Sequence, residues 1–189
     1  LRFPEFKEIL ISEKLSNVAD VRDGTHDTPK YVENGYPLVT SKNLLASGKL
    51  DLVNVSFISQ ADFDQINKRS KVDEGDILFG MIGTIGNPVR VDSDGFAIKN
   101  VALIKKRCAV DMGWLISYFN SIHLLRQFYL LNAGGTQKFI SLGSIRNLNV
   151  IFPSLPEQQK IASFLSSVDK QIDLQRQKKD ALELYKKGL

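Results

Sequence analysis

The stretch between Pro156 and Gly188 contains no glycine or proline, and it constrains the fold more than any other feature of the sequence. Pro156 fits the first turn of a helix, where its ring fixes φ and its missing N–H is not needed. Glu157 adds a negative charge at the positive end of such a helix, and Lys186 and Lys187 suit its last turn. We therefore expect one helix over residues 156–187, and about 32 residues at 1.5 Å each give roughly 48 Å.

The expected helix carries the seam of a coiled coil. Seven positions are separated alternately by four and three residues, which is the spacing that brings side chains to one face of a paired helix. The two polar members are Gln175 and Lys179. The apolar members, which we expect to pair with a second long helix, are Ile161, Leu165, Val168, Ile172 and Leu182. A helix folded back on its own domain is the alternative, and the heptad favours a straight partner over a curved sheet.

The preceding residues, 1–152, have a different character, with frequent glycines and short β-rich runs bounded by turn residues. The sequence therefore predicts an α/β (α+β) globular domain with a mixed β-sheet over residues 1–152, followed by a long coiled-coil helix over residues 153–189. The runs that we expect to be strands are residues 36–40, 52–58, 76–81, 100–106 and 148–152.

One amphipathic helix is expected within this domain, over residues 113–131. Its apolar residues recur at steps of three and four, so they predict a face that packs in the core. Those residues are Leu115, Tyr118, Ile122, Leu125 and Tyr129. Trp114 and Phe119 fall in the same pattern and are expected to be core residues rather than a platform for stacking bases.

The composition indicates an ordinary globular protein, since 43% of the residues are hydrophobic and 24% are charged. A single cysteine, Cys108, cannot form an internal disulfide and favours a reducing compartment. No secretory segment opens the sequence, and polar residues interrupt its longest apolar stretch. We therefore expect a soluble, cytoplasmic protein that does not enter a membrane.

Signatures of catalysis are absent from the sequence. Gly80, Gly83 and Gly86 have a spacing that differs from that of the dinucleotide-binding motif, so tight turns explain them better. Two histidines and one cysteine cannot supply the ligands of an ordinary structural zinc site. The sequence around His26 and Ser41 lacks a nucleophile elbow. We therefore expect no catalytic residues, no metal and no cofactor.

Four loops combine small polar and basic residues: residues 22–29, 40–43, 99–100 and 134–138. Such side chains bind phosphates and base edges in nucleic-acid complexes. The same residue types are common in turns, so each loop taken alone also fits a purely structural role. The net charge of +4 permits nucleic-acid binding without requiring it.

Several motifs together resemble the specificity subunit of a type I restriction-modification system. The most specific are GGTQKFISL at residues 134–142 and PSLPEQQKIASFL at residues 153–165. The others are LRFPEF at residues 1–6, DGTH at 23–26, EGDIL at 74–78 and GTIG at 83–86. The similarity extends over nearly the whole chain.

This resemblance implies recognition of DNA without catalysis. Members of the family usually carry two target recognition domains, each followed by a conserved spacer helix, and the two helices pair antiparallel. This chain has one of each, so it resembles half a subunit, either a fragment or a half-subunit that pairs with a second copy. It would recognise one half of a bipartite target in double-stranded DNA and position methyltransferase (M) and restriction (R) subunits.

The resemblance also implies that loops of residues 1–152 contact DNA. The residues that we expect to do so are Thr25, His26, Ser41, Lys42, Asn43, Thr84, Thr136, Gln137 and Lys138. For the motif around residues 134–138 we favour phosphate contact or a structural role, because a motif shared by subunits with different targets cannot select the sequence. The chief alternative is a coiled-coil adaptor whose α/β head binds protein. A stand-alone methyltransferase or nuclease is a third possibility, and it would require cofactor binding or turnover.

Overall fold

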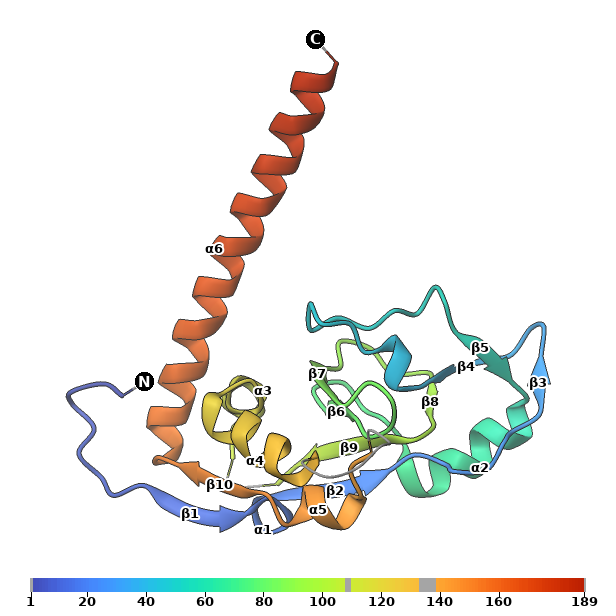
Figure 1. The fold of residues 1–189 in the computed structure, drawn as a ribbon, viewed down its shortest axis with the longest axis horizontal. Helices are drawn as coiled ribbons and strands as arrows, with labels where there is room; N and C mark the ends of the chain where they lie inside the picture. Colours follow the sequence, from blue (N-terminus) through green and yellow to red (C-terminus); the bar gives the residue numbers. More distant parts are fainter. Residues whose placement is uncertain (1, 108–109, 133–138, 189) are drawn as a thin grey trace.

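The computed structural model describes residues 2–107, 110–132 and 139–188, which form a head and one long projecting helix (Figure 1). The strands are β1 (Ile11–Lys14), β2 (Ala19–Asp23), β3 (Tyr31–Val32), β4 (Tyr36–Val39), β5 (Ser56–Ile58), β6 (Ile77–Gly80), β7 (Gly86–Arg90), β8 (Ala97–Ile98), β9 (Val101–Lys106) and β10 (Asn149–Phe152). The helices are α1 (Leu15–Val18), the 3-10 turn η1 (Ser41–Asn43), α2 (Gln60–Ser70), α3 (Met112–Phe119), α4 (Ile122–Asn132), α5 (Leu142–Arg146) and α6 (Leu155–Lys187).

The described strands form three sheets. An antiparallel sheet has the order β2-β9-β6-β7, and a mixed sheet has the order β3-β5-β4-β8, in which β4 and β8 are parallel. Strands β1 and β10 form a separate antiparallel pair. Each of the five runs expected from sequence contains a strand, and the predicted α/β head with a mixed sheet is confirmed.

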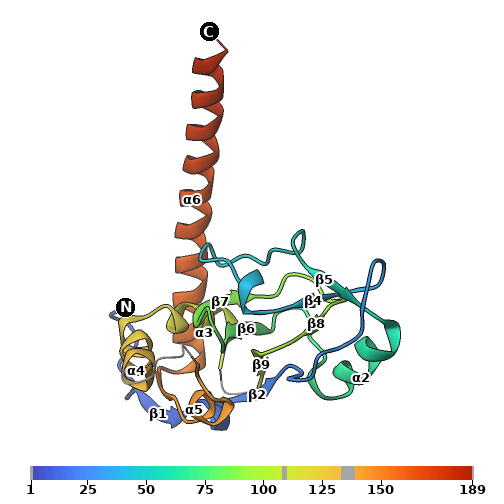
Figure 2. The same cartoon turned by 45° about the vertical axis from the view of Figure 1, so that its right-hand side comes forward.

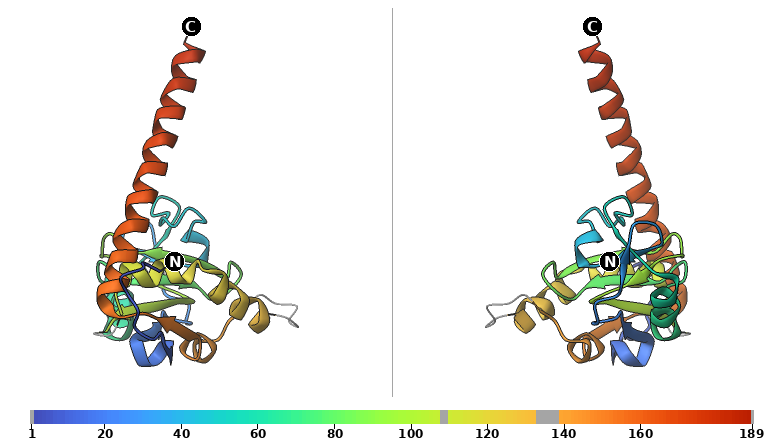
Figure 3. Two further views of the ribbon diagram at one scale, coloured as in Figure 1. Left: turned by 90° about the vertical axis from the view of Figure 1, so that its left-hand side faces the viewer. Right: turned by 90° about the vertical axis from the view of Figure 1, so that its right-hand side faces the viewer.

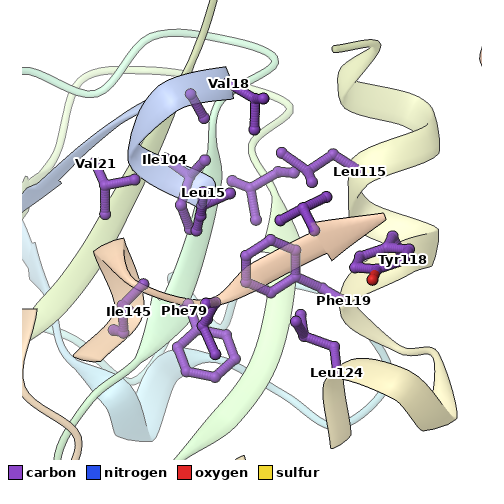
Figure 4. Packing of buried hydrophobic residues seen from close by; sticks show 14 of the residues in the cluster. Leu15, Val18, Val21, Phe79, Ile104, Leu115, Tyr118, Phe119, Leu124 and Ile145 are labelled. Atoms are coloured by element: carbon purple, nitrogen blue, oxygen red, sulfur yellow. The ribbon is translucent and has the colours of Figure 1, made fainter. Parts of the chain in front are cut away.

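Apolar residues fill the head in two main layers. The larger cluster lies between the β2-β9-β6-β7 sheet and helices α3 to α5, where Phe79, Leu115 and Phe119 are almost completely buried (Figure 4). A second cluster, which includes Leu78 and Ile98, joins the two four-stranded sheets. Trp114 and Phe119 are core residues, as the sequence predicted.

The prediction of a single helix over residues 113–131 is wrong in one respect, because two helices, α3 and α4, cover this range. Asn120 ends α3, where its backbone has φ −90° and ψ 0°. The Ser121 side chain then accepts a hydrogen bond from the Leu124 amide at 3.4 Å. The break changes which face of the second half is buried. Leu124 and Phe128 enter the core, whereas Ile122, Leu125 and Tyr129 are at least half exposed.

Helix α2 was not expected from the sequence. Its N-terminus is capped by Ser59, whose hydroxyl accepts a hydrogen bond from the Asp62 amide at 3.2 Å. Only a narrow strip of α2 is apolar. Ile66 of this strip packs in a small cluster with Leu38 and Ile58 of the mixed sheet. That sheet thereby gains a covering layer at its outer end (Figure 2).

Helix α6 is 33 residues long, about 50 Å at 1.5 Å per residue, and its bounds agree with the sequence prediction to within one residue. The helix packs against α3 of the head near its base and then projects away from the head (Figure 3). The alternative in which the helix folds back on its own domain does not match the structure. The N-terminus of the chain lies beside the base of α6, and the C-terminus lies at its far end (Figure 1).

Candidate nucleic-acid interface and the surface of the long helix

Three of the polar loops meet at one edge of the mixed sheet. The Thr25 amide donates to the Ile98 carbonyl at 3.0 Å, and the Asn100 amide donates to the Thr25 carbonyl at 3.1 Å. The Ser41 hydroxyl donates to the Asn100 carbonyl at 3.2 Å. These bonds bring together segments that are far apart in the sequence, which no single loop could indicate.

His26 lies at the exposed side of this junction. Its Nδ1 is 2.7 Å from Asn100 Oδ1, and its Nε2 is 2.7 Å from Asp23 Oδ2. These two acceptors, Asn100 first and then Asp23, raise the pKa of His26 above 6.5. Arg69 holds the other oxygen of Asp23 at 3.1 Å. The His26 ring, whose side chain is 54% exposed, therefore favours a positive charge at the molecular surface.

The second loop, residues 40–43, contains both buried side chains that hold its conformation and an exposed side chain that can bind a ligand. Ser41 and Asn43 are buried, at 4% and 5% exposure. The Asn43 side chain accepts from the Thr40 amide at 2.9 Å and donates to the Asn54 carbonyl at 2.9 Å, so it fastens the loop. Lys42 lies between them with its side chain exposed.

A depression of about 370 Å³ lies at this junction. Five of its lining residues lie outside the polar loops expected from sequence: Tyr31, Leu38, Asn54, Ser56 and Ile82. The other lining residues are Thr40, Ser41, Lys42, Asn43, Lys99 and Asn100, of which Ser41, Lys42 and Asn43 were expected as site residues. Within the described residues, the hydroxyls of Tyr31 and Ser56 and the ammonium group of Lys42 make no hydrogen bond inside the protein. Tyr31 lies on a two-residue strand too short for any sequence pattern to reveal.

Thr84 is exposed in the tight turn between β6 and β7. The turn requires glycine, because a Cβ on Gly80 would lie 2.2 Å from the Thr84 carbonyl oxygen and Gly86 has a φ of +95°. Ile82 of the same turn lines the depression and forms an isolated bridge with Phe139. Thr136, Gln137 and Lys138 lie outside the described residues, so their positions stay predictions.

The seam positions of α6 fall into two groups. Ile161 is 5% exposed and belongs to the core of the head, and Leu165 packs against the same cluster. The expected pairing position Ile161 is therefore occupied within its own chain. Val168, Ile172 and Leu182 are 39%, 43% and 57% exposed, so the seam from Val168 onward is open to solvent.

Among the described residues there is no group of three or more histidine, cysteine, aspartate or glutamate side chains that could hold a metal ion. In the same part of the chain, no helix combines the length and apolar composition needed to cross a membrane.

The comparisons with known proteins agree with this architecture. A family model described as the type I restriction modification DNA specificity domain matches residues 13–184. The specificity subunit of the type I restriction enzyme MjaVIII from Methanocaldococcus jannaschii is 27% identical over 197 residues, covering 98% of this chain and 45% of that protein.

Two solved structures have the same fold. The HsdS subunit from Thermoanaerobacter tengcongensis gives a TM-score of 0.63 at 18% identity, over 91% of this chain and 41% of that one. The S subunit of a type I restriction-modification system from M. genitalium gives a TM-score of 0.62 at 16% identity, over 90% and 41%. The chain spans less than half the length of each of these relatives. Because the family model covers most of the sequence, the chain belongs to the type I restriction-modification DNA specificity family.

Proposed function

We propose that this chain is the part of a specificity subunit that recognises one half of a bipartite DNA target. Residues 1–152 act as the target recognition domain, and residues 153–189 act as the spacer helix. The observation that carries the proposal is that three polar loops meet at one edge of the mixed sheet in a chain of this family, and that two of them line a depression there. The chain supplies recognition and has no catalysis or cofactor of its own.

Within this proposal, the exposed and buried side chains of the loops have different roles. Lys42, Lys99 and His26, whose raised pKa favours the charged form, contact DNA phosphates. The hydroxyls of Tyr31 and Ser56, which make no hydrogen bond within the described part of the chain, reach base edges. The buried side chains of Ser41 and Asn43 hold the loop in the conformation that presents Lys42. Thr25 joins two loops through its backbone, and Thr84 extends the surface from the turn that holds Ile82. Thr136, Gln137 and Lys138 contribute phosphate contacts or a structural role.

The exposed seam of α6 pairs with the corresponding helix of a second recognition unit, in a second copy or in another part of a longer protein. With complete overlap, an antiparallel pair of helices about 50 Å long places the two heads roughly 15 base pairs apart at about 3.4 Å per step. Methyltransferase (M) subunits bind the paired helices and the heads, and restriction (R) subunits join through them. A symmetric pair of identical chains requires a target with two-fold symmetry.

The test begins in cells that carry the complete system. Methylated adenines are mapped with and without this gene, which gives the target sequence. Binding of the full chain to a duplex with that target is then measured from low to physiological salt. The proposal predicts an affinity that falls steeply with salt, because bound lysine and arginine side chains release counterions from the phosphates.

Lys42→Ala should weaken duplex binding and reduce the salt slope by about one, with the preferred sequence unchanged. Lys178→Ala is the matched control, since it removes an exposed lysine from α6 rather than from the loops. Unchanged adenine methylation without the gene, together with no duplex binding at any salt, would overturn the proposal and favour the adaptor.

A further inference from the structure

Two polar side chains at the base of α6 are completely buried. Glu157 and Gln158 are both 0% exposed, although both residue types usually lie at protein surfaces. A buried carboxylate is costly unless a partner compensates its charge. The contacts of these two residues therefore identify what holds the helix at its base.

Arg2 supplies the partner of Glu157. Its Nε donates to Oε1 at 3.0 Å and its Nη2 donates to Oε2 at 2.8 Å, which is the two-pronged geometry of guanidinium and carboxylate. The same Nη2 also donates to the carbonyl oxygens of Phe6 and Glu8, at 3.3 and 3.1 Å. Arg2 thus ties the N-terminal segment to the first turn of α6 across 155 residues of sequence.

Further contacts hold the same turns from other directions. Lys160 forms an ion pair with Glu5, and its ammonium group lies 4.6 Å from the centre of the Phe3 ring. The Phe3 and Phe164 rings pack edge to face, with their centroids 6.0 Å apart. On the side of the head, Gln158 Oε1 accepts from the Asp111 amide at 2.8 Å, just before α3. The first turns of α6 are therefore clamped between the N-terminal segment and α3.

The length of α6 amplifies any change at this clamp. From Glu157 to Lys187 the helix extends roughly 45 Å, so a tilt of about 10° at the base moves the tip by roughly 8 Å. That displacement is more than two base-pair steps of about 3.4 Å. Small changes at the base are therefore large on the scale of a DNA target.

We propose that Arg2 and Glu157 are positioning residues that fix the direction in which α6 leaves the head, and thereby the spacing of the DNA half-sites. The two parallel hydrogen bonds between Arg2 and Glu157, here called the fork, do this because they restrict the relative rotation of the two side chains as well as their distance. The consequence for DNA rests on the proposed function, whereas the direction of the helix is a property of this chain alone.

The direction is measured by electron paramagnetic resonance on the full chain. Spin labels are attached at Lys49→Cys on the head and Lys178→Cys on α6, in a Cys108→Ser background and diluted with unlabelled protein. The unaltered clamp should give one narrow distance distribution. Arg2→Ala and Glu157→Gln should broaden it by several ångströms, because each removes the fork.

Glu183→Gln is the matched control, since it makes the same chemical change at an exposed position of the same helix, and it should leave the distribution narrow. Near-ultraviolet circular dichroism checks that the head stays folded. If Glu157→Gln does not fold, Arg2→Ala decides, because Arg2 is partly exposed and lies outside the core. A distribution as narrow as that of the unaltered clamp in a folded Arg2→Ala chain overturns the proposal.

The second experiment measures which duplexes the protein binds, from a pool in which the half-sites are separated by different numbers of base pairs. The unaltered protein should prefer one spacing, and Arg2→Ala should accept spacings one or two base pairs longer and shorter. A general loss of stability would lower affinity at all spacings without changing the preference. If the distance distribution broadens but no duplex binds even with Arg2 in place, the clamp stands and the proposed DNA function fails. If binding keeps the same single spacing in Arg2→Ala, the inference fails and the DNA function stands.

Discussion

The base of α6 and its projecting part share one heptad pattern but have different surroundings. At the base, Ile161 is buried in the head and Leu165 packs beside it. Further along, Val168 and Ile172 occupy the next equivalent positions and are exposed. A heptad therefore identifies an apolar seam without identifying what covers it. The first two seam positions stabilise the head itself, and only the later ones are free to bind another helix.

The largest expected effect sharpens this contrast within the seam. Ile161→Ala should lower the free energy of unfolding by about 2–5 kcal/mol, because it leaves a cavity where the helix joins the core. Urea unfolding at low protein concentration measures the change. Ile172→Ala is the matched control and should change the stability of the separate chain by less than about 1 kcal/mol. Equal losses at both positions would contradict the division of the helix.

Self-association should depend on the exposed seam positions rather than on the buried ones. Ile172→Asp places a charge in the open seam and should weaken self-association of the full chain roughly a hundredfold, or about 2.8 kcal/mol. Sedimentation velocity over a range of concentrations measures it. Leu174→Asp provides the control, because Leu174 is similarly exposed, at 48%, but lies away from the seam. The pairing proposal fails if both variants sediment like the unaltered chain.

The same contrast between buried and exposed neighbours occurs within the second loop. Asn43→Ala should cost about 1–2 kcal/mol of unfolding free energy, because the Thr40 amide and the Asn54 carbonyl lose their partner. Lys42→Ala should leave stability within about 0.5 kcal/mol and reduce only DNA binding. Thermal unfolding of both variants checks this. A Lys42→Ala chain that is destabilised as much as Asn43→Ala would show that our division of the loop is wrong.

The smallest effect concerns His26. Because its folded pKa is raised above 6.5, its contribution to stability is present below that value and is lost as the pH rises through the folded pKa. An NMR titration should place the His26 midpoint above 6.5, and Asp23→Asn should lower it. In a His123→Gln variant the one remaining histidine is His26, so the signal that persists in its spectrum is that of His26. A His26 midpoint that Asp23→Asn leaves unchanged would remove the role of the carboxylate.

Much of the fold followed from local patterns. The absence of glycine and proline bounded α6 to within one residue, and β-rich runs located five of the strands. Other elements lacked such signals. Strand β3 has only two residues, and α2 has only the Ser59 cap and a narrow apolar strip, which predicted no helix there. At Asn120, a local break outweighed a helical periodicity that continued past it.

The sequence alone determined that a long helix with an apolar seam follows a mixed α/β head, and its motifs identified the family. Helix length and periodicity depend on neighbouring residues, so they can be read along the chain. Only the tertiary structure decided that Ile161 belongs to the head, that Tyr31 and Ser56 line the depression with Lys42, and that Arg2 neutralises Glu157. These relations join residues far apart in sequence, and they depend on how the sheets and helices pack.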